Sequence, residues 1–190
     1  MVDHEIFNSN SVDWKRLKEL FVTHGIQKTY SRKDFLCRLG DKPTHFVFIE
    51  KGGFKHICID SAGKERIITF HFEGEFLGGY IASRCNCNLL MNIQAIEDSV
   101  VYELSYSEFN EALKVYFPNT HDFRLKVAEI IALECQQKLL SVCCETPGER
   151  YQKLIKHAPD IINRVSLREI SSYLGITPET LSRMRTRMLK

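Results

Sequence analysis

Three residues near the C-terminus carry side chains that could read the edges of base pairs: Glu179, Arg183 and Arg187. A guanidinium group can donate two parallel hydrogen bonds to guanine, and a carboxylate can accept one from the amino group of cytosine. Arg183 is the best candidate for the guanine contact, and Glu179 could accept from cytosine. Such readout requires an element that presents these side chains on one exposed face.

The element that must position them is the C-terminal stretch SLREISSYLGITPETLSRMRTRMLK. Its pattern predicts a helix, a tight turn at Gly175 and a second helix. Ser166 is a suitable N-cap for the first helix, and Glu169 completes a capping box three residues later. Glycine allows the positive φ of a helix C-terminus, and Pro178 suits the first position of the second helix. This is the layout of a helix-turn-helix.

The other positions of this stretch divide into an inward and an outward face. Apolar side chains and one small serine fall at mutually consistent helical offsets, and we expect them to point inward. The inward positions are Ile170, Ser171, Leu174, Ile176, Leu181 and Met184. The residues left for DNA are Ser166, Arg168, Thr177, Pro178, Glu179, Thr180, Ser182, Arg183, Thr186 and Arg187. Ser166, Arg168, Thr177 and Thr180 are better placed for phosphates than for bases. A plain helical hairpin is the alternative interpretation.

Charge is distributed unevenly along the chain. Residues 147–190 contain nine Lys or Arg against four Asp or Glu, whereas residues 1–146 contain 17 against 20. Positive charge is therefore concentrated where phosphates would be bound.

The first half of the chain changes from a helical pattern to short strands. We expect a helix over residues 3–23, with its apolar side chains at roughly helical spacing and Gly25 after it. Between residues 26 and 104, strand-like pieces are separated by turn residues at intervals of about 8–12 residues. This pattern predicts a small β-barrel or jelly roll, closed by a pair of strands within residues 92–104. The expected apolar positions are Ile6, Phe7, Trp14, Leu17, Leu20 and Phe21 in the helix and Phe46, Phe48, Ile57 and Ile59 in alternating strands.

A long helix is expected next. Residues 106–116 form a short helix that Pro118 stops, and a longer helix follows from about residue 119 to 144. Its apolar residues cover more of the circumference than one core-facing stripe requires. They are Phe123, Leu125, Val127, Ile130, Ile131, Leu133, Leu139, Leu140 and Val142. The helix could lie across the barrel, but a second stripe packed on a symmetry mate is favoured, because DNA-reading modules usually work in pairs.

The segment Thr146-Pro147-Gly148 is the best domain boundary. We divide the chain into a β-roll domain with flanking helices (residues 1–118), a long helix and hinge (119–146) and an all-α DNA-binding domain (147–190). A helix over residues 149–157 opens the last of these.

Composition limits the cellular setting. The 190-residue chain has no apolar run of the roughly 20 residues that a membrane span needs, and its N-terminus, MVDHEIFNSN, has no secretory signal. We therefore expect a cytoplasmic protein with no membrane partner. The seven cysteines follow no disulfide framework and are expected to be reduced thiols.

The whole chain resembles the Crp/Fnr family of bacterial transcription regulators. The stretch GDKPTHFVFIEKGGFKHICIDSAGKERIITFHFEGEFLGGY is similar to the family's cyclic-nucleotide-binding β-roll, a double-stranded β-helix. GERYQKLI resembles the start of its DNA-binding domain, and ITPETLSRMRTRM resembles its recognition helix. The resemblance implies an α+β fold and puts Glu179 and Arg183 at base-reading positions. Pro178 replaces the first base-reading arginine, and because the sequence ends at Lys190 we expect the domain to lack the family's β-hairpin wing.

The resemblance also implies an effector pocket around Gly78, Gly79, Arg84, Asn86, Asn88, Leu89 and Leu90. Cyclic-AMP binders of the family hold the ribose with a glutamate and the cyclic phosphate with an Arg-Ser pair. Gly79 stands in place of that glutamate, and Leu89 and Leu90 stand in place of the pair. A buried phosphate without a cation or hydroxyl partner would be poorly compensated. Arg84, Asn86 and Asn88 lie nearby and could substitute for these partners, but an effector other than cyclic AMP is favoured. We expect no other cofactor, and at most an unknown small-molecule effector.

Other chemistry has little support in the sequence. The cysteines lack cluster-binding spacing, although Cys85 and Cys87 beside the expected pocket keep thiol-based redox sensing open. A metal-binding jelly-roll enzyme would need a close His-x-His pair. We instead expect His45, His56 and His71 to be surface or hydrogen-bonded strand residues. We predict no catalytic residue and no metal site.

The sequence thus predicts a homodimeric, sequence-specific transcription regulator. Its long helix would join two subunits, and its partner would be double-stranded DNA with a palindromic operator; RNA polymerase is a further candidate partner. The alternatives are a dimeric effector-binding module without working DNA recognition and a thiol-based redox sensor.

Overall fold

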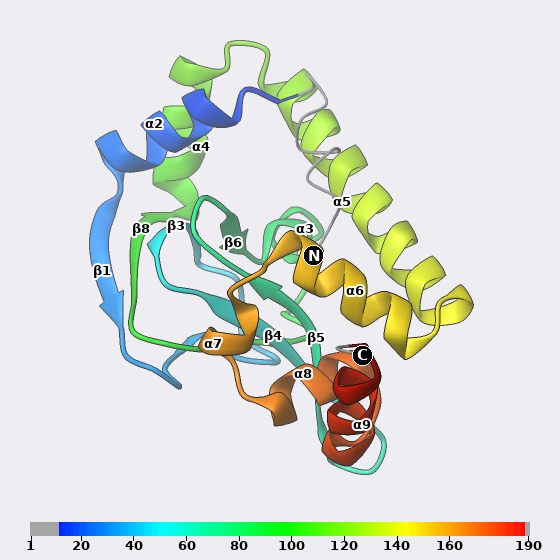
Figure 1. The fold of residues 1–190 in the computed structure, drawn as a ribbon. Helices are drawn as coiled ribbons and strands as arrows, with labels where there is room; N and C mark the ends of the chain where they lie inside the picture. Colours follow the sequence, from blue (N-terminus) through cyan, green and yellow to red (C-terminus); the bar gives the residue numbers. More distant parts are fainter. Residues whose placement is uncertain (1–11, 189–190) are drawn as a thin grey trace.

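The computed structural model describes residues 12–188. Two antiparallel sheets face each other as a roll, a long helix leaves this β-roll, and a group of short helices ends the described chain (Figure 1). The predicted jelly-roll architecture, with its long helix and helical C-terminal region, is confirmed.

Each sheet has four strands. The first runs in the order β1 (Ile26–Tyr30), β8 (Ser99–Ser105), β3 (His45–Lys51) and β6 (Phe76–Gly78). The second runs in the order β2 (Phe35–Cys37), β7 (Asn92–Ala95), β4 (Phe54–Ile59) and β5 (Glu65–His71). The two strands expected within residues 92–104 are present as β7 and β8, but they lie in different sheets and do not pair with each other.

The sheets enclose an apolar interior, and helices cover the outer side of the first sheet. Val47 and Ile49 of β3 lie in the interior cluster, whereas Phe46 and Phe48 pack outward against the helices. The side chains of β3 thus alternate between the two faces of the sheet, and both faces are covered. In β4 the register shifts between His56 and Ile57, and Ile59 is 44% exposed instead of buried.

Three helices flank the roll. They are α2 (Trp14–His24), α3 (Tyr80–Arg84) and α4 (Tyr106–Tyr116). Asp13 caps α2 through the backbone N–H of Arg16, and Gly25 follows its last turn. The capping box of Ser105 and Glu108 starts α4. The helix expected over residues 3–23 is confirmed for its second half only; Ile6 and Phe7 lie outside the described residues.

The long helix α5 spans Thr120–Cys144, with Asn119 as its N-cap. Only Phe123 and Ile130 of this helix are buried. The helix exposes large apolar side chains, most of them in its second half: Leu125, Leu133, Leu139, Leu140 and Val142 are 41–63% exposed. The helix ends at Glu145, and Thr146 begins the next helix as its N-cap.

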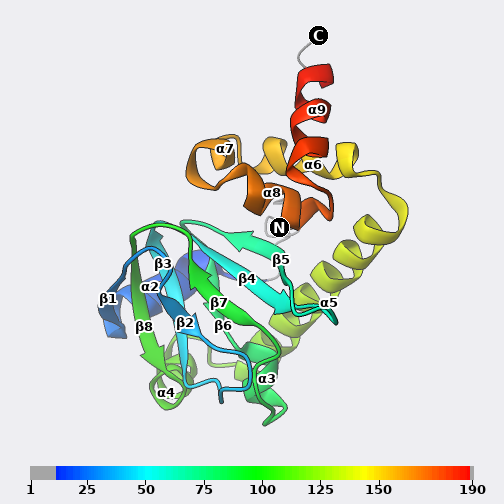
Figure 2. The same cartoon turned by 90° about the horizontal axis from the view of Figure 1, so that it is seen from below.

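The last four helices form a unit that packs on the outer face of β5. They are α6 (Pro147–His157), α7 (Ile161–Arg164), α8 (Leu167–Leu174) and α9 (Pro178–Met188). Ile67 and Phe70 of β5 share an apolar cluster with Leu154, Ile170 and Leu181 of this unit. Figure 2 shows α9 projecting away from the β-roll. Helix α6 begins at Pro147, two residues before the expected start, because Thr146 and Glu149 form a capping box.

Within residues 12–188, no helix has the length and apolar character required to cross a membrane. The same part of the chain gathers no three His, Cys, Asp or Glu side chains in a ready metal-binding arrangement.

Candidate nucleic-acid interface

The turn between α8 and α9 has the geometry predicted from the sequence. Ser166 Oγ accepts a hydrogen bond from the backbone N–H of Glu169, and the Glu169 carboxylate accepts one from the Ser166 N–H. Gly175 ends α8 with a φ of 71°, in the left-handed region. The Ile176 N–H then donates to the Ser171 carbonyl, which closes the turn. The capping box, the glycine and this hydrogen bond are all local, and together they shape the turn from which α9 starts.

The second helix begins with a hydroxyl cap. The Thr180 N–H donates to Thr177 Oγ1 at 3.2 Å, and Pro178 occupies the first helical position. Hydrogen bonds from its own N–H and from Thr177 lower the pKa of the Glu179 carboxyl. Glu179 is therefore an anionic acceptor at neutral pH.

Burial separates the two faces of α9. Leu181 is fully buried and Met184 partly buried, which anchors one face on α8 and on the apolar cluster below it. The opposite face is open to solvent, and Thr180 at its edge is half-buried. The predicted DNA-binding residues that are exposed are Ser166, Arg168, Thr177, Pro178, Glu179, Ser182, Arg183, Thr186 and Arg187. The structure thus brings the predicted base-reading residues together on one side of one helix.

Two of the predicted phosphate-binding side chains already have structural roles. Ser166 Oγ also donates to Glu169 Oε2 at 2.8 Å, and Thr177 Oγ1 bonds the Thr180 hydroxyl at 3.1 Å. Their hydroxyls cap helices, so they could meet a phosphate only while keeping those bonds. Arg168, at the start of α8, is exposed.

Lys55 and Arg164 make polar contacts that help to fix the helical unit to the β-roll. Lys55 of β4 donates to Glu169 at 2.6 Å. Burial raises the pKa of the Glu169 carboxyl, but the hydrogen bonds from Lys55 and Ser166 outweigh it and hold the pKa below its ordinary value. Arg164 of α7 makes parallel hydrogen bonds of 2.8 and 2.9 Å to Glu73, and further ones to Glu97. These contacts tie the orientation of α8, and therefore of α9, to the β-roll.

Most of the side chains predicted for an effector pocket are exposed at the surface. Arg84, Asn86, Asn88 and Leu90 are exposed around α3 and the loop that follows, whereas Leu89 is buried. A Cβ atom added to Gly79 would lie 2.4 Å from Leu89 Cδ2 and 2.8 Å from Pro43 Cβ. Leu89 thus packs directly on Gly79, and a larger residue at this position would clash. Gly78 has a φ of 129°, as its place at the end of β6 requires.

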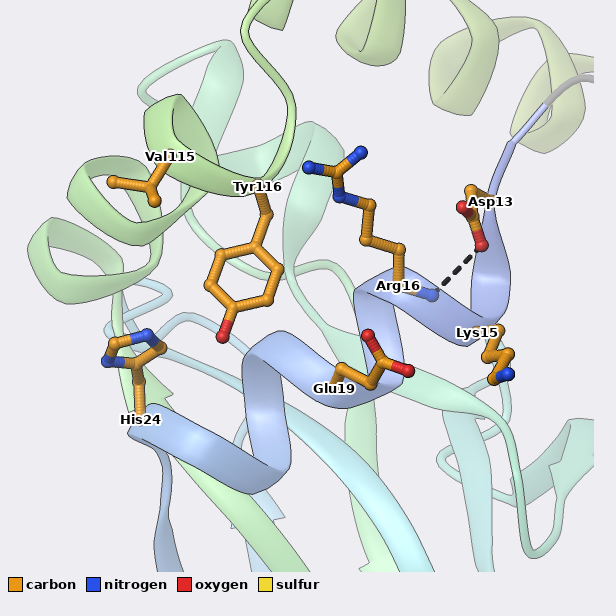
Figure 3. Close-up of a pocket in the computed structure, with 7 residues that line it drawn as sticks. All are labelled: Asp13, Lys15, Arg16, Glu19, His24, Val115 and Tyr116. Atoms are coloured by element: carbon orange, nitrogen blue, oxygen red, sulfur yellow. Dashed lines mark hydrogen bonds between the residues drawn. The ribbon is translucent and has the colours of Figure 1, made fainter.

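An open, mostly polar surface pocket lies elsewhere, between α2 and α4 (Figure 3). Its floor includes Tyr116, whose ring meets His24 edge-on at 5.6 Å between centroids. The lining residues are Asp13, Lys15, Arg16, Glu19, His24, Val115 and Tyr116. None of them belongs to the predicted effector set.

The histidine prediction needs a correction. His45 is exposed, and His71 bonds Glu75 as expected, but the Nε2 atoms of His56 and His71 are both buried without a hydrogen-bond partner in the part of the chain that the structure describes. The pairing of β4 with β5 brings the two rings together. Sequence spacing could not reveal this contact, because it depends on the register of the hairpin.

Comparisons with known proteins agree with this architecture. Residues 27–116 match the family described as the cyclic nucleotide-binding domain. The transcriptional activator protein Anr of Pseudomonas aeruginosa is 26% identical over 165 residues, covering 81% of this chain and 66% of the relative. The transcriptional regulatory protein Btr of Bordetella pertussis is 28% identical over 161 residues, covering 77% and 64%. The chain thus spans just under two thirds of the length of these curated relatives.

Solved structures show the same fold. The c-di-GMP-responsive global regulator CLP of Xanthomonas campestris superposes with a TM-score of 0.69 at 16% identity, covering 93% of this chain and 92% of that one. FixK2 of Bradyrhizobium japonicum gives a TM-score of 0.69 at 18% identity, covering 86% and 84%. Fold and site define a cyclic-nucleotide-binding-like β-roll joined by a long helix to a helix-turn-helix unit. The resemblance to the Crp/Fnr family of transcription regulators is confirmed.

Proposed function

We propose that this chain is a sequence-specific, DNA-binding transcription regulator that acts in the cytoplasm as a homodimer and has no catalytic activity. The observation that carries the proposal is the exposed face of α9, where Glu179, Arg183 and Arg187 follow one another at helical spacing opposite the buried Leu181. The names of the relatives, a transcriptional activator and a transcriptional regulatory protein, support it. RNA polymerase is the further partner that such a role implies.

Binding to DNA is tested with the purified full chain on a library of genomic fragments. We expect selection of a palindromic site, followed by a loss of about 1–3 kcal/mol at one base position in Arg183→Ala. Lys156→Ala on α6 is the matched control, because it removes an exposed cation outside the proposed interface. If no fragment binds better than bulk competitor DNA, the proposal fails and the effector-binding module without DNA recognition takes its place.

The dimer is proposed to form through α5. A regulator of this type must hold two recognition helices about 34–36 Å apart to enter successive major grooves. The exposed Leu139 and Leu140 offer an apolar surface for a second copy. Sedimentation of Leu139→Glu should show a monomer where the unmodified chain is a dimer. Leu90→Glu, an exposed leucine in the loop after α3, should leave the dimer intact; equal behaviour of the two variants would count against α5.

The β-roll is proposed to respond to an effector other than cyclic AMP. Leu89 packs against Gly79 where the family's ribose and phosphate contacts would stand, and the nearest arginine of the expected set, Arg84, is exposed. A cyclic phosphate there would lack a buried cation partner. Calorimetry with cyclic AMP and cyclic GMP should show no binding, and micromolar affinity for either nucleotide would overturn this part of the proposal.

A further inference from the structure

Two histidines of the β-roll face each other across the β4–β5 hairpin. The ring centroids of His56 and His71 are 4.7 Å apart, and the ring planes are tilted by 47°. His56 pairs with Thr69 in the hairpin register, so His71, two residues further along β5, lies on the same face of the sheet. Both Nε2 atoms are buried, and neither has a hydrogen-bond partner within residues 12–188. Buried polar atoms of this kind usually have a partner.

Glu75 determines which ring nitrogen of His71 is available. Its Oε2 lies 2.7 Å from His71 Nδ1. A carboxylate accepts hydrogen bonds, so the Nδ1–H of His71 donates to Glu75 and Nε2 is the ring nitrogen left for another ligand. A carboxylate that holds the second nitrogen of a histidine in this way is a regular feature of metal-binding histidines.

His56 offers the second open nitrogen, because its Nε2 atom is buried without a hydrogen-bond partner within residues 12–188. The Glu134 carboxyl of α5 interacts electrostatically with His71 and Glu75. Two imidazoles and the Glu75 carboxylate thus lie together at the hairpin, and Glu134 of the long helix interacts with this group electrostatically.

The geometry points to a site for a divalent transition-metal ion of the zinc type, with Nε2 of His56 and Nε2 of His71 as ligands. A metal ion at about 2.1 Å from Nε2 lies roughly 3.2 Å from the ring centroid. Two centroids 4.7 Å apart then subtend an angle of about 95° at an ion to which both nitrogens point. That angle suits two neighbouring ligands of one ion.

Glu134 of α5 is a candidate further ligand of this site. Because no three His, Cys, Asp or Glu side chains are already gathered around one point in residues 12–188, the ion binds the two imidazoles first and takes water or the Glu134 carboxylate as further ligands. Binding would thereby draw the long helix toward the β-roll. This proposal rests on the proposed function in one respect: the metal ion would be the effector to which the β-roll responds.

The test is a titration of the chelator-treated full chain with Co²⁺, followed by visible absorption, and with Zn²⁺, followed by calorimetry. We expect one saturable site per chain with nitrogen and oxygen ligation, and no thiolate charge-transfer band from the exposed cysteines. His56→Gln and His71→Asn should each weaken binding at least ten-fold, and Glu75→Gln should weaken it about ten-fold by releasing the His71 ring. Circular dichroism verifies that each variant folds.

His121→Ala is the matched control, because this histidine is exposed at the start of α5 and should leave affinity unchanged. Absence of saturable binding, equal losses in His121→Ala and His56→Gln, or uptake of protons without uptake of metal would each overturn the site. Gel-shift experiments without metal separate this result from the proposed function. DNA binding without metal binding removes only the site, whereas metal binding without any DNA binding under either condition removes the regulator proposal.

Discussion

Replacement of Arg164 by alanine should loosen the helical unit from the β-roll. Arg164 lies in α7, and its guanidinium bonds Glu73 through two parallel contacts and Glu97 through Nε at 2.8 Å. It also stacks over the Phe72 ring, 4.4 Å from the centroid. The variant removes all of these contacts at once and leaves two carboxylates facing each other without their shared cation.

The size of the effect follows from the exposure of the partners. Hydrogen bonds to charged groups contribute about 1.5–3 kcal/mol, but exposed ion pairs contribute only about 0.2–1 kcal/mol. The side chains of Arg164, Glu97 and Glu73 are 23%, 33% and 42% exposed. We therefore expect a loss of about 2 kcal/mol, which corresponds to a change of about 30-fold in the ratio of docked to undocked unit.

The Ile67 amide provides a direct reporter of docking, because it donates to Ser172 Oγ of α8 at 3.2 Å. Hydrogen exchange at Ile67 should become up to about 30-fold faster in Arg164→Ala, provided that exchange occurs through undocking. Arg124→Ala is the control, since Arg124 bonds Asn110 and joins α5 to α4 instead. Unchanged exchange at Ile67, or an equal increase in Arg124→Ala, would refute the argument that Arg164 holds the two parts together.

Two further predictions concern stability. Gly175→Val places a β-branched side chain at a φ of 71° and should lower the free energy of unfolding, measured in urea, by at least about 1–2 kcal/mol. Gly175→Asn should lower it clearly less, because asparagine tolerates this conformation. Equal losses in the two variants would contradict the argument from backbone conformation. Burial, assisted by Arg150, lowers the pKa of Lys138 to about 8, so the folded chain binds fewer protons than the unfolded chain between about pH 8 and 10.4. Lys138→Met should therefore raise the free energy of unfolding by about 1–2 kcal/mol at pH 7, less than the full shift implies because Lys138 is partly exposed and stacks on Tyr173. The gain should shrink as the pH approaches 10, and a gain independent of pH would contradict the assignment.

The C-terminal helix pair could be predicted closely because its determinants are local. A capping box needs residues three apart, and the left-handed turn needs one glycine at Gly175. The same holds for α4, which spans residues 106–116 as expected. The burial of Leu181 opposite Arg183 follows from helical periodicity alone.

What could not be predicted depends on contacts between distant segments. The outer face of β3 is buried only because α2 and α4 pack on Phe46 and Phe48. The shift at Ile57 depends on the pairing partner in β5. The docking of α8 on the β4–β5 hairpin joins residues more than a hundred positions apart, such as Lys55 and Glu169. Local patterns in a single sequence do not indicate which distant segments pair.

The side chains of the β4–β5 hairpin point to both faces of the sheet, because strand residues alternate between faces. His56 and His71 lie on one face, while their neighbours Lys55 and Phe70 contact α8 and its apolar cluster on the other. The two glutamates that follow β5 divide in the same way: Glu73 bonds Arg164 of the helical unit, and Glu75 bonds His71. A ligand that moves the histidine face must therefore also strain the face that holds α8. It can change DNA binding only if it prefers one of the two resulting arrangements of α9.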